Sequence, residues 1–245
     1  LNLSVYVPSA FILASRLEIY FSADKAVGHM QRGREFGLRK LMATNLLKRL
    51  ESSVQAFKLT LARVRATMED SIAKVNAFEK KKNSKVEVSD VKAFAEAAED
   101  FDLNEEEAIF TVGKVKPVKL EDMDYISWKH DIESDIRIIT QLLADLVKIT
   151  AAHDAKLDML KQVIQHKVTQ PFNAGNRKIL LFTAFSDTAQ YLYDNLTGKF
   201  NDELGLHVAL ITGTNDPKCT DAGIRKDFNT VLTCFSPISK ERELL

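Results

Sequence analysis

The sequence predicts a mixed α/β protein that is mostly helical, with a long antiparallel helical hairpin followed by a partial parallel-sheet domain. The chain has no glycine between Gly37 and Gly113 and no proline between Pro8 and Pro117, so this stretch is free to be helical. Apolar residues recur along it, and again after it, at helical spacing. Beyond Pro171, two short apolar runs replace these patterns, as is typical of buried parallel strands.

Two apolar stripes predict the two helices of the hairpin. The first resembles a coiled-coil seam, with steps of three and four that alternate up to a stutter after Met68, and it comprises Leu47, Leu50, Val54, Phe57, Leu61, Val64, Met68, Ile72, Val75 and Phe78. This spacing predicts one helix about 50 Å long at 1.5 Å per residue. The second stripe comprises Tyr125, Trp128, Ile132, Ile136, Ile139, Leu143, Leu146 and Ile149, and helical spacing restarts at Leu157. Because neither stripe is stable in water, we expect the two helices to pack antiparallel.

The connector between the stripes, residues 83–120, is acidic at its centre. From Glu87 to Glu107 it has nine acidic residues and one lysine. We expect it to be a solvated hairpin tip, and an acidic docking site for a basic partner is the alternative.

The last part of the chain predicts strands that alternate with helices. Residues 178–183 are an apolar run, and Ser186 then stands where a helix N-cap belongs. A second run, 207–212, ends at Gly213, and helical spacing returns over 224–235. Strand, helix, strand, helix implies a parallel sheet with right-handed crossovers. The expected regions are therefore an irregular or helical lead-in (1–36), a helical insertion (37–170) and the start of a sheet domain (171–245).

Composition sets limits on partners and location. The 34 basic residues balance the 34 acidic ones, so any nucleic-acid binding must come from local patches. Cys219 and Cys234 have no ligand-type spacing, which favours a reducing, cytoplasmic setting. No apolar run is long enough for a membrane helix, so we expect no membrane partner, and the apolar opening lacks a basic leader.

Motifs for catalysis are missing from the sequence. Neither Gly113-Lys114 nor Gly198-Lys199 belongs to a phosphate-binding loop, because no glycine stands five positions before and no Ser or Thr follows. The acidic pair Asp202–Glu203 does not follow an apolar strand, which favours a surface turn. The five histidines are scattered without metal-ligand spacing. We therefore predict no catalytic residue and no metal site in this chain.

Three segments together resemble bacterial Swi/Snf-type helicase-like ATPases of helicase superfamily two. Residues 38–54 contain the run LLKRLESS, which in that family leads into a long helix. The stretch RKILLFTAFSDTAQYLYDNL, followed by HVALITG, is similar to the start of the second RecA-like motor domain. Residues 228–240, FNTVLTCFSPISK, resemble the segment after its second strand. The resemblance covers about 37–240.

The resemblance implies a fragment of a DNA-dependent ATPase. The parent protein would bind ATP and Mg²⁺, but its catalytic lysine, acidic metal ligand and arginine motifs match nothing here. We therefore expect this fragment alone to bind no ATP and to be inactive. Two strand-end motifs do match, Phe185-Ser186 and Thr212-Gly213-Thr214, and would face the phosphate backbone of nucleic acid. The alternative is that Ser186 is a helix cap and Gly213 a turn residue.

Basic residues beside the first stripe give a second candidate contact. Arg39, Lys40, Lys48 and Arg49 could support duplex DNA, and a solvated helix face is the alternative. The expected partners are double-stranded DNA and the remaining motor domain of the same protein. The rival function is a helical scaffold or interaction module fused to an unrelated α/β domain.

Overall fold

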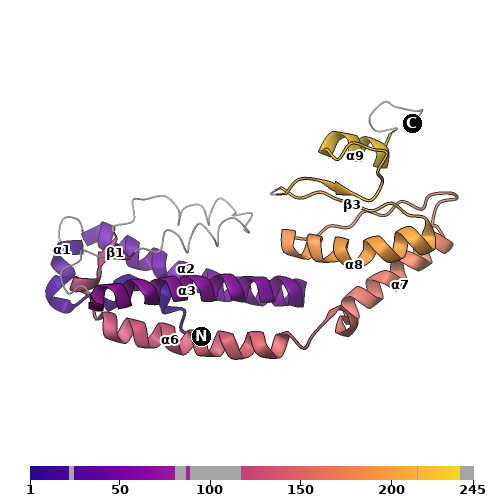
Figure 1. The fold of residues 1–245 in the computed structure, drawn as a ribbon. Coiled ribbons are helices and arrows are strands. Elements are labelled where there is room, and N and C mark those ends of the chain that lie inside the picture. The colour runs from indigo at the N-terminus through magenta and orange to yellow at the C-terminus, as the bar shows by residue number, and fades with distance from the viewer. Residues whose placement is uncertain (22–24, 81–86, 89–116, 214, 238–245) are drawn as a thin grey trace. The chain divides into compact units, whose positions relative to one another are not determined.

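The computed structural model describes residues 1–21, 25–80, 87–88, 117–213 and 215–237 (Figure 1). Side chains are described for the same residues except 25–30 and 87–88. The chain divides into two compact units. The first comprises Leu1–Glu51 and Phe57–Leu146, and the second comprises Ser52–Ala56 and Val147–Leu245.

The first unit is mostly helical. Its short helices are η1 (Ser4–Tyr6), η2 (Pro8–Phe11), η3 (Ala14–Arg16), α1 (Leu17–Phe21) and η5 (Leu120–Asp122). Its long helices are α2 (Lys25–Ser52), α3 (Val54–Lys80) and α6 (Tyr125–Leu146). Two short strands, β1 (Glu87–Val88) and β2 (Val118–Lys119), pair antiparallel.

Helices α3 and α6 lie side by side and form the antiparallel hairpin that the two stripes predict (Figure 1). The end of α3 meets the start of α6, where the rings of Phe78 and Tyr125 pack edge to face with centroids 5.4 Å apart. One turn further along α6, the Lys129 ammonium lies 2.9 Å from the Glu79 carboxylate. The three long helices share one core. The buried residues that these helices contribute to it are Leu38, Met42, Leu46, Leu61, Val64, Met68, Val75, Trp128, Ile132 and Ile139.

The prediction of one continuous helix over the first stripe is wrong, because the helix is interrupted at Ser53, between α2 and α3. The Ser53 hydroxyl accepts a hydrogen bond from the Ala56 N–H at 3.0 Å and so caps the start of α3. Serine favours such positions because its hydroxyl competes for backbone groups. Leu47 and Leu50 therefore belong to α2, where they are 68% and 42% exposed instead of buried in the seam.

The N-terminal lead-in is held by buried carboxylates of the long helices. Asp135 of α6 is 1% exposed and accepts hydrogen bonds from the backbone N–H groups of Asn2 and Leu3, at 2.7 and 2.6 Å. The Trp128 indole N–H donates to the Ser4 carbonyl at 2.9 Å. A segment without long regular structure thus has its backbone groups satisfied by side chains.

Glu35 of α2 likewise accepts hydrogen bonds from the next residues of the lead-in. It is 1% exposed, and its Oε2 accepts from the Ser9 N–H at 2.9 Å and from the Ser9 hydroxyl at 2.6 Å. Hydrogen bonds to an ionised group each contribute about 1.5–3 kcal/mol, so two carboxylates can fix a stretch that has little helix or strand of its own.

The acidic connector lies mostly outside the described residues, so its expected solvated tip stays a prediction for 83–86 and 89–116. Its last residues, 117–120, are described: Pro117 and Lys119 are half-buried, whereas Val118 and Leu120 are buried. Val118 is 1% exposed and Leu120 is fully buried in the core of the first unit. For these residues the prediction is wrong, because apolar side chains at the end of the acidic run pack beside α6.

The second unit has a separate core between two helices. Its helices are η6 (Ala151–His153), α7 (Ala155–Thr169), α8 (Ser186–Leu204) and α9 (Phe228–Phe235). Its buried residues are Leu157, Ile164 and Val168 of α7 and Leu196 and Phe200 of α8. Asp154 links the two helices, since its Oδ1 caps α7 at the Leu157 N–H and its Oδ2 accepts from the Tyr191 hydroxyl of α8 at 2.9 Å.

The expected parallel sheet is absent from the described part of the second unit. Residues 178–183 form neither helix nor strand. The second run does contain a strand, β3 (Ala209–Leu210), but it pairs antiparallel with β4 (Lys218–Cys219). An apolar run supplies only the propensity for a strand, and the strand itself needs a hydrogen-bonding neighbour. Among the described helices, none is both long and apolar enough to cross a membrane.

Replacing Leu61 with aspartate should unfold the first unit. Leu61 is fully buried in the seam between α2, α3 and α6, so the change removes apolar contacts and buries an unpaired carboxylate, at a cost of about 4 kcal/mol or more. The matched control is Ala62→Asp, on the exposed side of the same helical turn. Urea unfolding followed by circular dichroism measures both variants. Equal stability of the two variants would contradict the burial of Leu61 between these three helices.

We predict that the folded protein loses stability at alkaline pH, where the Tyr20 hydroxyl ionises. It donates to Asp122 Oδ2 at 2.7 Å and accepts from the Lys119 N–H at 3.1 Å. Burial, followed by the Asp122 carboxylate, raises the pKa of Tyr20 to about 12 despite the opposing N–H donor. Because the folded pKa exceeds the unfolded value of about 10, this stabilisation is complete below about pH 10 and is lost as the pH rises to about 12.

Tyr20→Phe removes both hydrogen bonds of the hydroxyl and should lower the free energy of unfolding by about 1 kcal/mol or more at neutral pH. The difference from wild type should shrink above about pH 10, as the wild-type phenol ionises. Urea titrations at neutral pH and near pH 11 measure the difference. A difference of the same size at both pH values would mean that the Tyr20 hydroxyl does not titrate with folding.

Candidate functional site

The start of α8 carries the first strand-end motif. Phe185 occupies the N-cap position and Ser186 is the first helical residue, so the helix begins one residue earlier than a Ser186 cap requires. No side chain caps this helix start, and the structure describes no hydrogen bond of the Ser186 hydroxyl. Asp187 follows in the first turn. The cap alternative for Ser186 is therefore wrong.

The next residue, Thr188, is where two distant sequence segments meet. It is 5% exposed, and its Oγ1 lies 2.8 Å from the Ser52 hydroxyl and 3.0 Å from the Ser53 hydroxyl. Ser53 also caps α3 at Ala56. The three hydroxyls form a small buried cluster that fixes the turn between α2 and α3 against the first turn of α8. Sequence reasoning missed this cluster, and its available signal was the pair of serines within the long apolar stripe.

The second strand-end motif follows β3 and is exposed or half-exposed. The Thr212 Oγ1 accepts a hydrogen bond from the Asn215 N–H at 3.1 Å, so this side chain already stabilises a turn. A Cβ added to Gly213 would meet nothing within 4 Å, and Gly213 is not among the described glycines with a left-handed φ. Neither backbone geometry nor crowding therefore requires glycine there. Thr214 lies outside the described residues.

The β3–β4 hairpin is attached to the early turns of α8. The Lys218 ammonium of β4 donates to Gln190 Oε1 of α8 at 2.6 Å. β3 itself contacts α8. The two strand-end motifs thus belong to elements that pack together, but no described hydrogen bond or ring contact joins Phe185 or Ser186 to Thr212 or Gly213.

The four basic residues lie on α2, in the first unit, and differ in exposure. Lys40 and Lys48 are exposed, and the Arg39 guanidinium lies 4.9 Å from the centroid of the Phe36 ring. Arg49 is only 1% exposed, so its predicted contact with DNA from outside is wrong for the described conformation. Its position, three residues after the buried Leu46, turns it toward the core. The other three residues remain candidates.

Neither a metal centre nor an acid–base pair emerges from the described residues. No group of three His, Cys, Asp or Glu side chains among them could hold a metal ion. The perturbed acids serve as helix caps, as at Asp227, whose pKa is lowered by hydrogen bonds from Thr230 at the start of α9. Burial, followed by Asp154, raises the pKa of Tyr191, and this pair links α7 to α8. These shifts have structural causes.

No protein-family model matches the chain, and neither a curated protein nor a solved structure is significantly similar to it.

The hydroxyl cluster predicts which of the neighbouring polar residues contribute to stability. Thr188→Val keeps the shape of the side chain but removes both hydroxyl contacts, and Ser53→Ala also removes the cap of α3. Each change should lower the free energy of unfolding by about 1 kcal/mol or more. Ser186→Ala is the matched control and should change stability by less than about 0.5 kcal/mol. Thermal unfolding followed by circular dichroism compares the three. A Ser186→Ala loss as large as the others would restore Ser186 as a structural cap.

Proposed function

We propose that the chain is part of a Swi/Snf-type, DNA-dependent ATPase motor, to which it contributes nucleic-acid contacts and helical support. The observation that carries the proposal is the contact between two of the segments on which the resemblance depends. Ser52 and Ser53, which end the run LLKRLESS, meet Thr188 in the stretch FSDTA, through hydroxyls 2.8 and 3.0 Å apart. Two motifs separated by about 130 residues in sequence are expected to pack together if they belong to one functional unit.

The chemistry at the start of α8 fits a phosphate. A helix N-terminus presents unpaired N–H groups and the positive end of the helix dipole, which favour an anion. The Ser186 hydroxyl has no described partner and adds a donor beside them. Gly213 adds backbone that an external group can approach closely, since no side chain covers it. In this proposal Phe185, Ser186, Thr212, Gly213 and Thr214 follow the backbone of the bound strand.

The proposal includes a RecA-like sheet in which residues 178–183 and β3 are neighbouring strands. Its cofactors, ATP and Mg²⁺, would be bound by the rest of the parent protein, which also supplies the second motor domain as a partner. Double-stranded DNA is the proposed substrate, with Lys40 and Lys48 as exposed basic support, and the cytoplasm is the proposed location.

A helical scaffold is the second candidate function, and the first unit favours it. Its three long helices share a continuous core, and one face of α2 exposes Phe36 and Leu47, at 45% and 68%. These two exposed apolar side chains on one helix face fit contact with a partner helix. The two functions differ in what the chain binds, because a scaffold has no need of an open phosphate site in the second unit.

Gly213→Ala separates the two functions. The change should leave thermal stability unchanged or slightly higher, because the position is open and its φ is not left-handed. It should weaken binding of the purified chain to fluorescein-labelled duplex DNA by about fivefold, or about 1 kcal/mol, because a methyl group obstructs approach to the backbone.

The matched control is Gly198→Ala, in the middle of α8, where a Cβ also meets nothing within 4 Å. It should leave DNA affinity unchanged. Fluorescence anisotropy at several salt concentrations gives both affinities, since phosphate contacts weaken as salt rises. Affinity that is the same for wild type, Gly213→Ala and Gly198→Ala, or no salt-dependent binding by the wild type, would exclude the phosphate site and favour the scaffold.

A further inference from the structure

The segment 178–183 has the sequence KILLFT and lies in the second unit, and the described contacts leave the backbone of its residues 179–182 unpaired. No backbone–backbone hydrogen bond of Ile179, Leu180, Leu181 or Phe182 is present among the described contacts. Peptide N–H and C=O groups nearly always have partners in folded proteins, and water is their partner here unless another strand covers them. Two open edges of backbone are therefore available for pairing.

The side chains of this segment already alternate as they do in a strand. Ile179 packs against the core of the second unit, and Leu181 is 44% exposed, whereas Leu180 and Phe182 are 61% and 88% exposed. Successive side chains of a strand point to opposite faces. Ile179 is thus turned toward the core between α7 and α8, whereas Leu180, Leu181 and Phe182 hold large apolar side chains in solvent.

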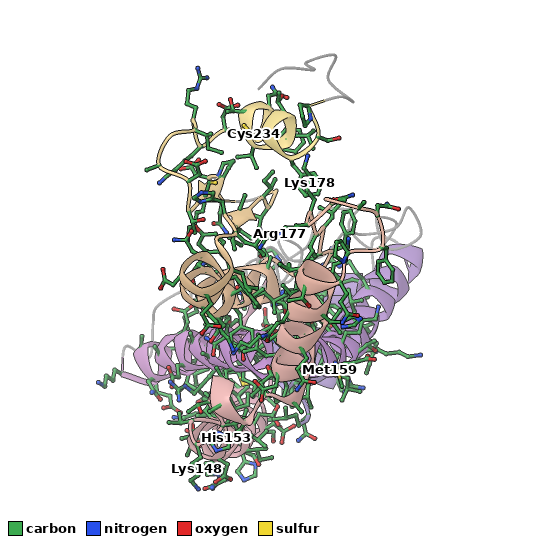
Figure 2. All side chains as sticks on the ribbon, turned by 90° about the vertical axis from the view of Figure 1, so that its right-hand side faces the viewer. Lys148, His153, Met159, Arg177, Lys178 and Cys234 are labelled. Carbon is green, nitrogen blue, oxygen red and sulfur yellow. The ribbon has the colours of Figure 1, made fainter. Side chains whose placement is uncertain are left out.

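The start of the segment is anchored by its basic residues (Figure 2). The Arg177 guanidinium donates to the Leu204 carbonyl at the end of α8, at 2.6 Å. The Lys178 ammonium donates to the Phe235 carbonyl at the end of α9 and lies 5.8 Å from the Phe235 ring. Two anchors hold the chain in place without using the backbone of 179–182, so the open edges belong to a positioned segment.

We propose that residues 178–183 pair as a β-strand with the same segment of a second copy of this chain, forming a two-fold dimer. A six-residue run with β-branched, leucine and aromatic residues, one charge and neither proline nor glycine has the composition of strands that self-associate. An exposed strand edge is completed by another strand, and a second copy presents an identical open edge. This proposal does not rest on the proposed function, because it uses one edge of the segment and leaves the other edge for a neighbouring strand such as β3.

Charge selects the antiparallel arrangement. Parallel pairing in register would place Arg177 and Lys178 beside the same residues of the second copy, and like charges directly opposite are destabilising. Antiparallel pairing puts these residues at opposite ends of the ladder and brings the apolar residues of the two copies together. An antiparallel pair also has two-fold symmetry, so each copy contributes the same edge of its segment to the dimer.

Sedimentation velocity of the purified chain over a wide concentration range tests the dimer. Wild type should pass from monomer to dimer as concentration rises. Leu180→Pro and Leu181→Pro each remove one N–H, on opposite edges of the segment, without breaking a described intrachain hydrogen bond. At least one of them should raise the dissociation constant by about tenfold or more. Circular dichroism checks that both variants keep the helices of the wild type.

Phe172→Lys and Phe182→Lys form the matched pair that distinguishes strand pairing from general stickiness. Phe172 is 87% exposed and Phe182 is 88% exposed, but only Phe182 belongs to the segment. Phe182→Lys should abolish dimerisation, and Phe172→Lys should leave it unchanged. A wild-type chain that stays monomeric throughout, proline variants that both dimerise like wild type, or an equal loss for the two lysine variants would each overturn the proposal.

Discussion

The break at Ser53 is the constraint on which the arrangement of the helices depends. A continuous helix would carry the first stripe past the core, whereas the capped turn lets α2 and α3 share one core with α6. The same turn brings the Ser52 and Ser53 hydroxyls to Thr188. One side chain that accepts a backbone N–H thus determines both the helix start and the position of a hydroxyl in the second unit.

Periodicity could predict α3 and α6 but could not locate the break between α2 and α3. Steps of three and four hold across Ser52 and Ser53, because Leu47 and Leu50 happen to continue the stripe of α3. The α2 residues that reach the core are spaced by four instead: Leu38, Met42 and Leu46. A stripe shows which residues could share a face, and capping chemistry decides whether they share a helix. The lead-in was less predictable still, since its partners Glu35 and Asp135 lie far away in sequence.

The candidate site likewise has some features that local sequence predicts and others that distant contacts determine. The start of α8 and the open position at Gly213 follow from local signals, namely an apolar run, a helix start and a glycine. Thr188 had no local signal, because its partners stand 135 and 136 residues earlier. The burial of Arg49 was equally hidden, since a basic residue next to a basic neighbour suggests a surface until the helix phase is known. Local sequence thus indicates where a ligand could approach, and distant contacts decide which side chains remain available to it.

The strand over 178–183 is where local propensity and tertiary structure disagree, and the disagreement itself is informative. Propensity, alternation of exposure and absence of proline all favour a strand, yet the described residues offer it no neighbour. A helix satisfies its own backbone, so α8 can form directly after this segment, but a strand cannot complete itself. Unpaired apolar backbone held in place by Arg177 and Lys178 is therefore a defined site for another strand. The segment of a second copy that pairs there would bury Leu180 and Phe182, and this burial favours pairing over an open edge in water.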